Sequence, residues 1–96
     1  MEKDRLNRYL NSIGKKCFAK YFHLFSDLRM ANHEVAEQIK IECDYTTKAC
    51  RSRTGHARLI IREGGASEAL RLIIESKRVE NGTVELAQMH LDNIIE

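Results

Sequence analysis

Apolar side chains recur at helical spacing along this chain, and no proline interrupts them. Between residues 6 and 28 the spacing is three or four residues throughout, which is the period of one side of an α-helix. Glycine stands at few positions, and Gly14, Gly64 and Gly65 are among those where a helix could end. We therefore predict an all-α fold, a compact bundle of four to five helices joined by short turns.

The positions of capping residues give the expected bounds of these helices. The first segment, up to residue 28, is one helix or two, with Gly14 as the weak point, because glycine costs about 1 kcal/mol relative to alanine inside a helix. Asn32 and Asp44 are predicted to cap the next two helices, and Gly64 and Gly65 to end the second of them. The helices expected after the first segment cover residues 33–41, 45–63, 66–76 and 83–95.

The sequence KRVENGTVEL at residues 77–86 fits two structures. Asn-Gly between two such runs is typical of a β-hairpin. A two-stranded ribbon alone would be of marginal stability, so we favour a turn between two helices with Thr83 as the N-cap. The sequence leaves both structures open.

The composition indicates a folded chain of one domain, residues 1–96. Hydrophobic residues make up 43% and charged residues 31%, a balance that favours folding over disorder. No run approaches the ~20 apolar residues of a membrane span, and the charged N-terminus lacks the apolar centre of a signal peptide. We therefore expect a cytoplasmic protein with no membrane partner. Its core is modest, and a homodimer would bury more apolar surface.

The net charge of +2 is unevenly distributed along the chain. Residues 1–20 carry six Lys or Arg against two Asp or Glu, and residues 44–63 carry five against two. Residues 64–96 carry three against six. A polyanionic partner would therefore favour the two basic segments and avoid the C-terminal third.

The second basic segment is amphipathic when it is read as a helix. At ~100° per residue, four of its five cationic side chains fall within a quarter of the helix circumference, and its apolar residues lie opposite. This basic stripe consists of Lys48, Arg51, Arg58 and Arg62. It would suit a helix that packs on a core and presents cations to a polyanion; the alternative is an ordinary solvated face.

Arg53 differs from these cations, because its angle places it within the apolar face. A buried guanidinium must be paired or hydrogen-bonded. We favour a structural arginine bonded to a carboxylate or to helix-end carbonyls. The alternative is a contact to a glutamate of a second subunit.

The segment HEVAEQIKIECDYTTKACRSR, residues 33–53, resembles a helix-turn-helix of the kind found in bacterial regulators. Ala36 is the small residue of the first helix, and Ile41 would be the apolar residue in the turn. The resemblance implies that the second helix enters the major groove of double-stranded DNA, with base edges read near its start and phosphates met further along. The residues expected to contact DNA are Tyr45, Thr47, Lys48, Arg51 and Ser52 at base edges, with Arg58 and Arg62 at phosphates.

Three residues of this segment depart from the helix-turn-helix pattern. Lys40 stands where the pattern usually has glycine, and Thr46 where it prefers a branched apolar residue. Asp44 places a negative charge near the groove unless it is used for capping. The resemblance covers about a fifth of the chain.

No pattern in the sequence indicates catalysis, a cofactor, a metal or a small-molecule substrate. Cys43, Cys50 and His56 are spaced too widely for ordinary zinc ligands, and no glycine loop for phosphate is present. Three cysteines without a CxxC pair predict free, partly buried thiols. We therefore expect a non-enzyme.

The rival function is a helical module for protein–protein interaction or dimerisation, without nucleic-acid binding. Phe18, Phe22 and Phe25 lie off the apolar stripe of the first segment, and surplus aromatic residues can mark a partner surface. We favour a wide face that packs between two neighbouring helices. The leading hypothesis is a small accessory or regulatory protein that binds DNA through helix 45–63.

Overall fold

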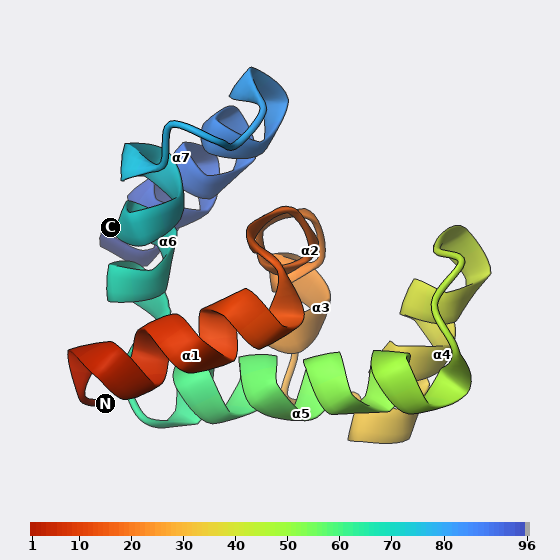
Figure 1. The fold of residues 1–96 in the computed structure, drawn as a ribbon. Coiled ribbons are helices and arrows are strands. Elements are labelled where there is room, and N and C mark those ends of the chain that lie inside the picture. The colour runs from red at the N-terminus through yellow and green to blue at the C-terminus, as the bar shows by residue number, and fades with distance from the viewer. Residues whose placement is uncertain (96) are drawn as a thin grey trace.

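The computed structural model describes residues 1–95, which form seven helices and no strand. Its principal extents of 30 × 26 × 26 Å are those of a compact body, and the all-α prediction is confirmed (Figure 1). The helix count exceeds the expected four to five because the first segment divides into three. The helices are α1 (Lys3–Ile13), α2 (Lys15–Lys20), α3 (Phe22–Phe25), α4 (Asn32–Glu42), α5 (Thr47–Arg62), α6 (Ala66–Glu75) and α7 (Asn81–Ile95).

Gly14 separates α1 from α2, which confirms it as the weak point of the first segment. Its φ of 90° lies in the region that favours glycine. A Cβ at this position would also lie 3.3 Å from Nη1 of Arg53. The break turns the chain away from α1 (Figure 1), so that α2 is free to pack against α7.

The starts of α4 and α5 differ from the predicted caps. Ala31, rather than Asn32, precedes α4, and its N–H donates to the Glu34 carboxylate at 2.9 Å. Thr46, rather than Asp44, caps α5, and its hydroxyl accepts from the Ala49 N–H at 3.1 Å. Both caps were therefore misplaced, by one residue and by two.

The end of α5 was predicted correctly at the two glycines. Gly64 has a φ of 78° and its N–H donates to the carbonyl of Ile61, while the Gly65 N–H donates to the carbonyl of Ile60. This pair of bonds is a Schellman motif, which satisfies carbonyls left free at a helix C-terminus.

The hairpin alternative for residues 77–86 is wrong. α6 ends at Glu75 and α7 begins at Asn81, so this region is a turn between two helices. Thr83 is not the N-cap, because it lies inside α7 and is only 5% exposed. Its methyl-bearing side chain faces inward with Ala87 and Leu91.

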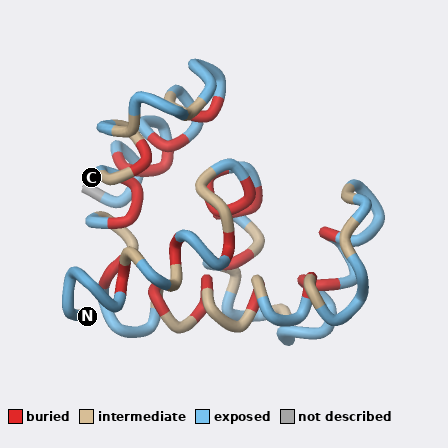
Figure 2. The backbone as a smooth tube through the Cα atoms, viewed as in Figure 1, coloured by how far each residue is buried: buried red, intermediate tan, exposed pale blue. Residues whose placement is uncertain are grey.

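The aromatic residues of the first segment fill the core. Phe18 and Phe25 are fully buried and Phe22 is 6% exposed. Buried residues occur along one side of each of the longer helices (Figure 2). The phenylalanines therefore pack between neighbouring helices, as the favoured alternative expected, and do not form a partner surface.

Candidate functional site

The candidate site is the pair α4 and α5 with the connection between them. Residues 43–46 join the two helices, and α4 runs across the N-terminal half of α5 rather than along it (Figure 1). Val35, Ala36 and Ile39 are buried on the inner face of α4, as predicted. A short connection thus joins two helices that are inclined steeply to one another (Figure 1).

Ile41 does not take the place that the helix-turn-helix resemblance gave it. It lies within α4 and is 78% exposed. Two residues beyond the buried Ile39, a helical side chain points to the opposite face. Cys43, the first residue after α4, is half-buried, and its thiol is hydrogen-bonded to the Tyr21 hydroxyl at 3.2 Å.

Four of the predicted contact residues lie together at the start of α5 and are exposed. This α5 surface consists of Thr47, Lys48, Arg51 and Ser52. Lys40 of α4 donates to the Thr47 hydroxyl and so links the two helices at this surface. No carboxylate in the described part of the chain is paired with Lys48 or Arg51, so both charges face solvent uncompensated.

Tyr45 and Arg53 form a contact behind the α5 surface. The guanidinium carbon of Arg53 lies 4.0 Å from the centre of the Tyr45 ring, and Nη1 donates to the carbonyl of Ile13. A cation at the last carbonyls of α1 is favoured by the helix dipole. Arg53 is therefore the structural arginine that the sequence predicted, bonded to a helix end. Tyr45 is half-buried beneath it rather than free at the surface.

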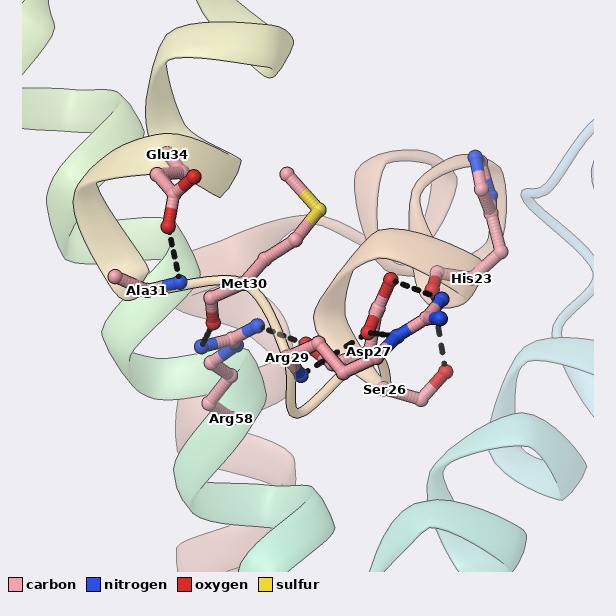
Figure 3. A network of polar contacts seen from close by, with 8 residues as sticks. All are labelled: His23, Ser26, Asp27, Arg29, Met30, Ala31, Glu34 and Arg58. Atoms are coloured by element: carbon pink, nitrogen blue, oxygen red, sulfur yellow. Dashed lines mark hydrogen bonds and ion pairs between the residues drawn. The ribbon is translucent and has the colours of Figure 1, made fainter.

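The prediction that Arg58 belongs to an exposed basic stripe is wrong, because this side chain is buried and only 8% exposed. It reaches from α5 into the connection between α3 and α4 (Figure 3). Nη1 donates to the Met30 carbonyl at 2.6 Å and to Asn32 Oδ1 at 2.9 Å, and Nη2 donates to the Asp27 carbonyl at 2.6 Å. A side chain held in this way cannot meet a phosphate. Its bond to Asn32 also explains why that side chain does not cap α4.

Arg62 remains exposed at the other end of α5. At 1.5 Å of rise per residue it lies about 16 Å along the axis from Arg51. The predicted stripe of four cations is therefore interrupted by the buried Arg58. Lys48 and Arg51 form one exposed group before it, and Arg62 is exposed alone after it.

The three cysteines are free thiols, as predicted. Cys17 and Cys50 are buried and Cys43 is half-buried. Burial raises the pKa of the Cys17 thiol to about 11, against the opposing effect of the Arg53 charge. Within residues 1–95, no group of three or more His, Cys, Asp or Glu side chains is placed to hold a metal ion.

None of the helices described for residues 1–95 is both long enough and apolar enough to cross a membrane. Comparison with protein-family models, with curated proteins and with solved structures gives no match for this chain.

Proposed function

We propose that this protein is a small accessory or regulatory factor that binds double-stranded DNA through the start of α5. The observation that carries the proposal is the exposure of the α5 surface on a helix whose inner face is buried in the core. Side chains at the start of such a helix are the ones that reach base edges in a major groove. Exposed, unpaired cations supply the attraction to phosphates.

Within this proposal the predicted contact residues divide by position. Thr47, Lys48, Arg51 and Ser52 form the contact surface. Arg62 lies too far along the axis to share a major groove ~12 Å wide with Arg51, so it would meet a phosphate at the groove wall. Arg58 acts only by holding α5 in place.

The test is duplex binding by a variant that carries Lys48→Glu and Arg51→Glu. Binding is measured by fluorescence anisotropy of a labelled duplex over a series of salt concentrations. If both side chains contact phosphates, log K against log[salt] should lose about 0.9 of slope for each lost contact. We expect a large loss of affinity at low salt and a slope shallower by about 1.8.

The matched control carries Arg71→Glu and Lys77→Glu, which make the same change in net charge. Both side chains are exposed and lie on or just after α6. This control should keep most of the affinity. Equal losses in the two variants would show a non-specific charge effect and would contradict binding through the α5 surface.

The alternative, a partner-binding or homodimeric module, is favoured by a different observation. Leu28 and Ile41 are each 78% exposed, and single large apolar residues this exposed can belong to an interface. If the native chain binds no duplex and sediments as a stable oligomer, this alternative replaces DNA binding. A cytoplasmic location and the absence of enzymatic activity are further parts of the proposal.

A further inference from the structure

A cavity of about 320 Å³ lies away from the α5 surface, where the break at Gly14 faces the turn between α6 and α7. It is lined on one side by the end of α1 and the start of α2, and on the other by residues 76–83. The polar side chains that matter for its chemistry are Lys15, Lys16, Ser76, Arg78, Glu80 and Thr83.

Two cations in this cavity have no carboxylate partner in the described part of the chain. Lys15 is half-buried, and its ammonium reaches only the Ser76 hydroxyl, at 3.4 Å. Arg78 lines the same cavity without an ion pair. Lys16 is paired with Glu80 at 3.7 Å, but both side chains are largely exposed, so this pair is weak. A partly buried cation without a counter-ion attracts an anion, because the anion supplies the missing opposite charge.

The hydroxyl groups of the cavity are also available as donors. Thr83 is 5% exposed as a whole residue, and it lines the cavity. Ser76 accepts from the Lys15 ammonium and from the Arg78 N–H, so its own hydroxyl proton remains free to donate. Hydroxyl groups that line a cavity beside two unpaired cations can donate to an anion bound there.

We propose that this cavity binds a phosphate group. A phosphate offers several strong acceptor oxygens and a charge of about −2, which matches two cations and two hydroxyl donors. Glu80 is the opposing charge, and its carboxylate limits the affinity, although its pair with Lys16 offsets part of that charge. The volume is that of a small ligand site. It therefore fits the phosphate of a small phosphorylated molecule, and a nucleic-acid phosphate is the other source of the same group.

The experiment is a titration of the isotope-labelled full-length chain with inorganic phosphate and with adenosine 5′-monophosphate, followed by amide NMR shifts at constant ionic strength. Saturable shifts are expected at Gly14, Ser76, Arg78 and Thr83. Lys15→Met and Arg78→Met should each weaken binding by roughly tenfold, the loss of one charged hydrogen bond. Glu80→Gln should strengthen it, because the opposing carboxylate is removed.

Lys77→Met is the matched control, since Lys77 is the exposed neighbour of Arg78 and does not line the cavity. It should leave phosphate affinity unchanged. Shifts that do not saturate, or an equal loss in Lys77→Met, would overturn the proposal. Adenosine without phosphate should give no saturable shift at these amides.

Duplex binding by the same variants distinguishes the two sources of the phosphate. Lys15→Met leaves duplex affinity unchanged if the ligand is a small molecule and lowers it if the ligand is a nucleic-acid phosphate. The site does not depend on the proposed function, because Lys48→Glu with Arg51→Glu removes duplex contacts and leaves this cavity intact.

Discussion

At the scale of the residue, Arg58 shows how a charge can serve the core of a small protein. Its guanidinium is buried without a bonded carboxylate. Two main-chain carbonyls and one amide oxygen accept from Nη1 and Nη2, while Nε is buried without a partner among the described residues. These acceptors belong to residues 27–32, which pass over α5 between α3 and α4. The arginine thereby replaces the hydrogen bonds that this connection would otherwise make with water.

Arg58→Met is expected to destabilise the fold by about 2–4 kcal/mol. Methionine fills a similar length but leaves the half-buried carbonyls of Asp27 and Met30 without this donor, and each group left unsatisfied away from water costs about 1–3 kcal/mol. Arg62→Met, on the exposed last turn of the same helix, should change stability by less than about 0.5 kcal/mol. Urea unfolding followed by circular dichroism measures both. A small effect of Arg58→Met would show that water satisfies the connection.

Arg53 and Arg58 together show what could be predicted from the sequence. Arg53 lies among apolar residues on a helical wheel, so its structural role was predictable from its angle alone. Arg58 lies on the polar side of the same wheel, and its acceptors are main-chain carbonyls that no residue type marks. Its burial depends on residues 27–32 crossing that side of α5, which is a tertiary arrangement. The helical spacing therefore predicted the apolar face of α5 and overestimated its free basic face.

At the scale of the element, α5 was predicted better at its end than at its start. The two glycines mark the end, because a left-handed residue is required there. Several residues before the helix could cap it, and Asp44, Thr46 and Thr47 all have suitable side chains. The residue that caps the helix is selected by the path of the connection from α4. Thr46 alone is placed to accept the Ala49 N–H.

Thr46→Ala is expected to lower the free energy of unfolding by about 1 kcal/mol, the usual cost of a lost N-cap. Asp44→Ala is the control, since Asp44 was the cap expected from the sequence and is exposed in the structure. It should have a much smaller effect. Thermal unfolding of the two variants beside the native chain makes the comparison, and a larger effect of Asp44→Ala would restore the cap predicted from the sequence.

The phosphate cavity illustrates why sites were harder to predict than helices. Its cations come from the start of α2 and from the turn before α7, and the Thr83 hydroxyl comes from α7 itself. No spacing in the sequence relates these residues, because they meet only when α7 packs against α2. The α5 surface could be proposed from the sequence because its four residues lie within two turns of one helix.

At the scale of the whole molecule, α7 is joined to the first segment of the chain by a buried histidine. A ring nitrogen of His90, Nε2, lies 3.0 Å from the carbonyl of Ala19 in α2, and the ring packs against Phe22 at 5.0 Å between centres. His90 is 8% exposed. This contact holds α7 against the first segment of the chain, and protonation of the His90 ring would alter it.

Acid is expected to destabilise the fold through this contact. Burial lowers the pKa of His90 below 6.5, against the hydrogen bond to Ala19, and the charge of His23 adds to the lowering. Below pH 6.5 the unfolded chain therefore binds a proton at His90 more readily than the native chain does. The free energy of unfolding should lose this contribution as the pH falls below 6.5, and the contribution is constant above it.

The measurement is urea unfolding of the native chain and of His90→Gln at a series of pH values from neutral to roughly pH 5. Glutamine can donate to the Ala19 carbonyl and does not bind a proton in this range. The variant should lose stability more slowly on acidification than the native chain, while His33→Gln, at an exposed position of α4, should follow the native curve. Parallel curves for the native chain and His90→Gln would show that protonation of this histidine is not opposed by the fold.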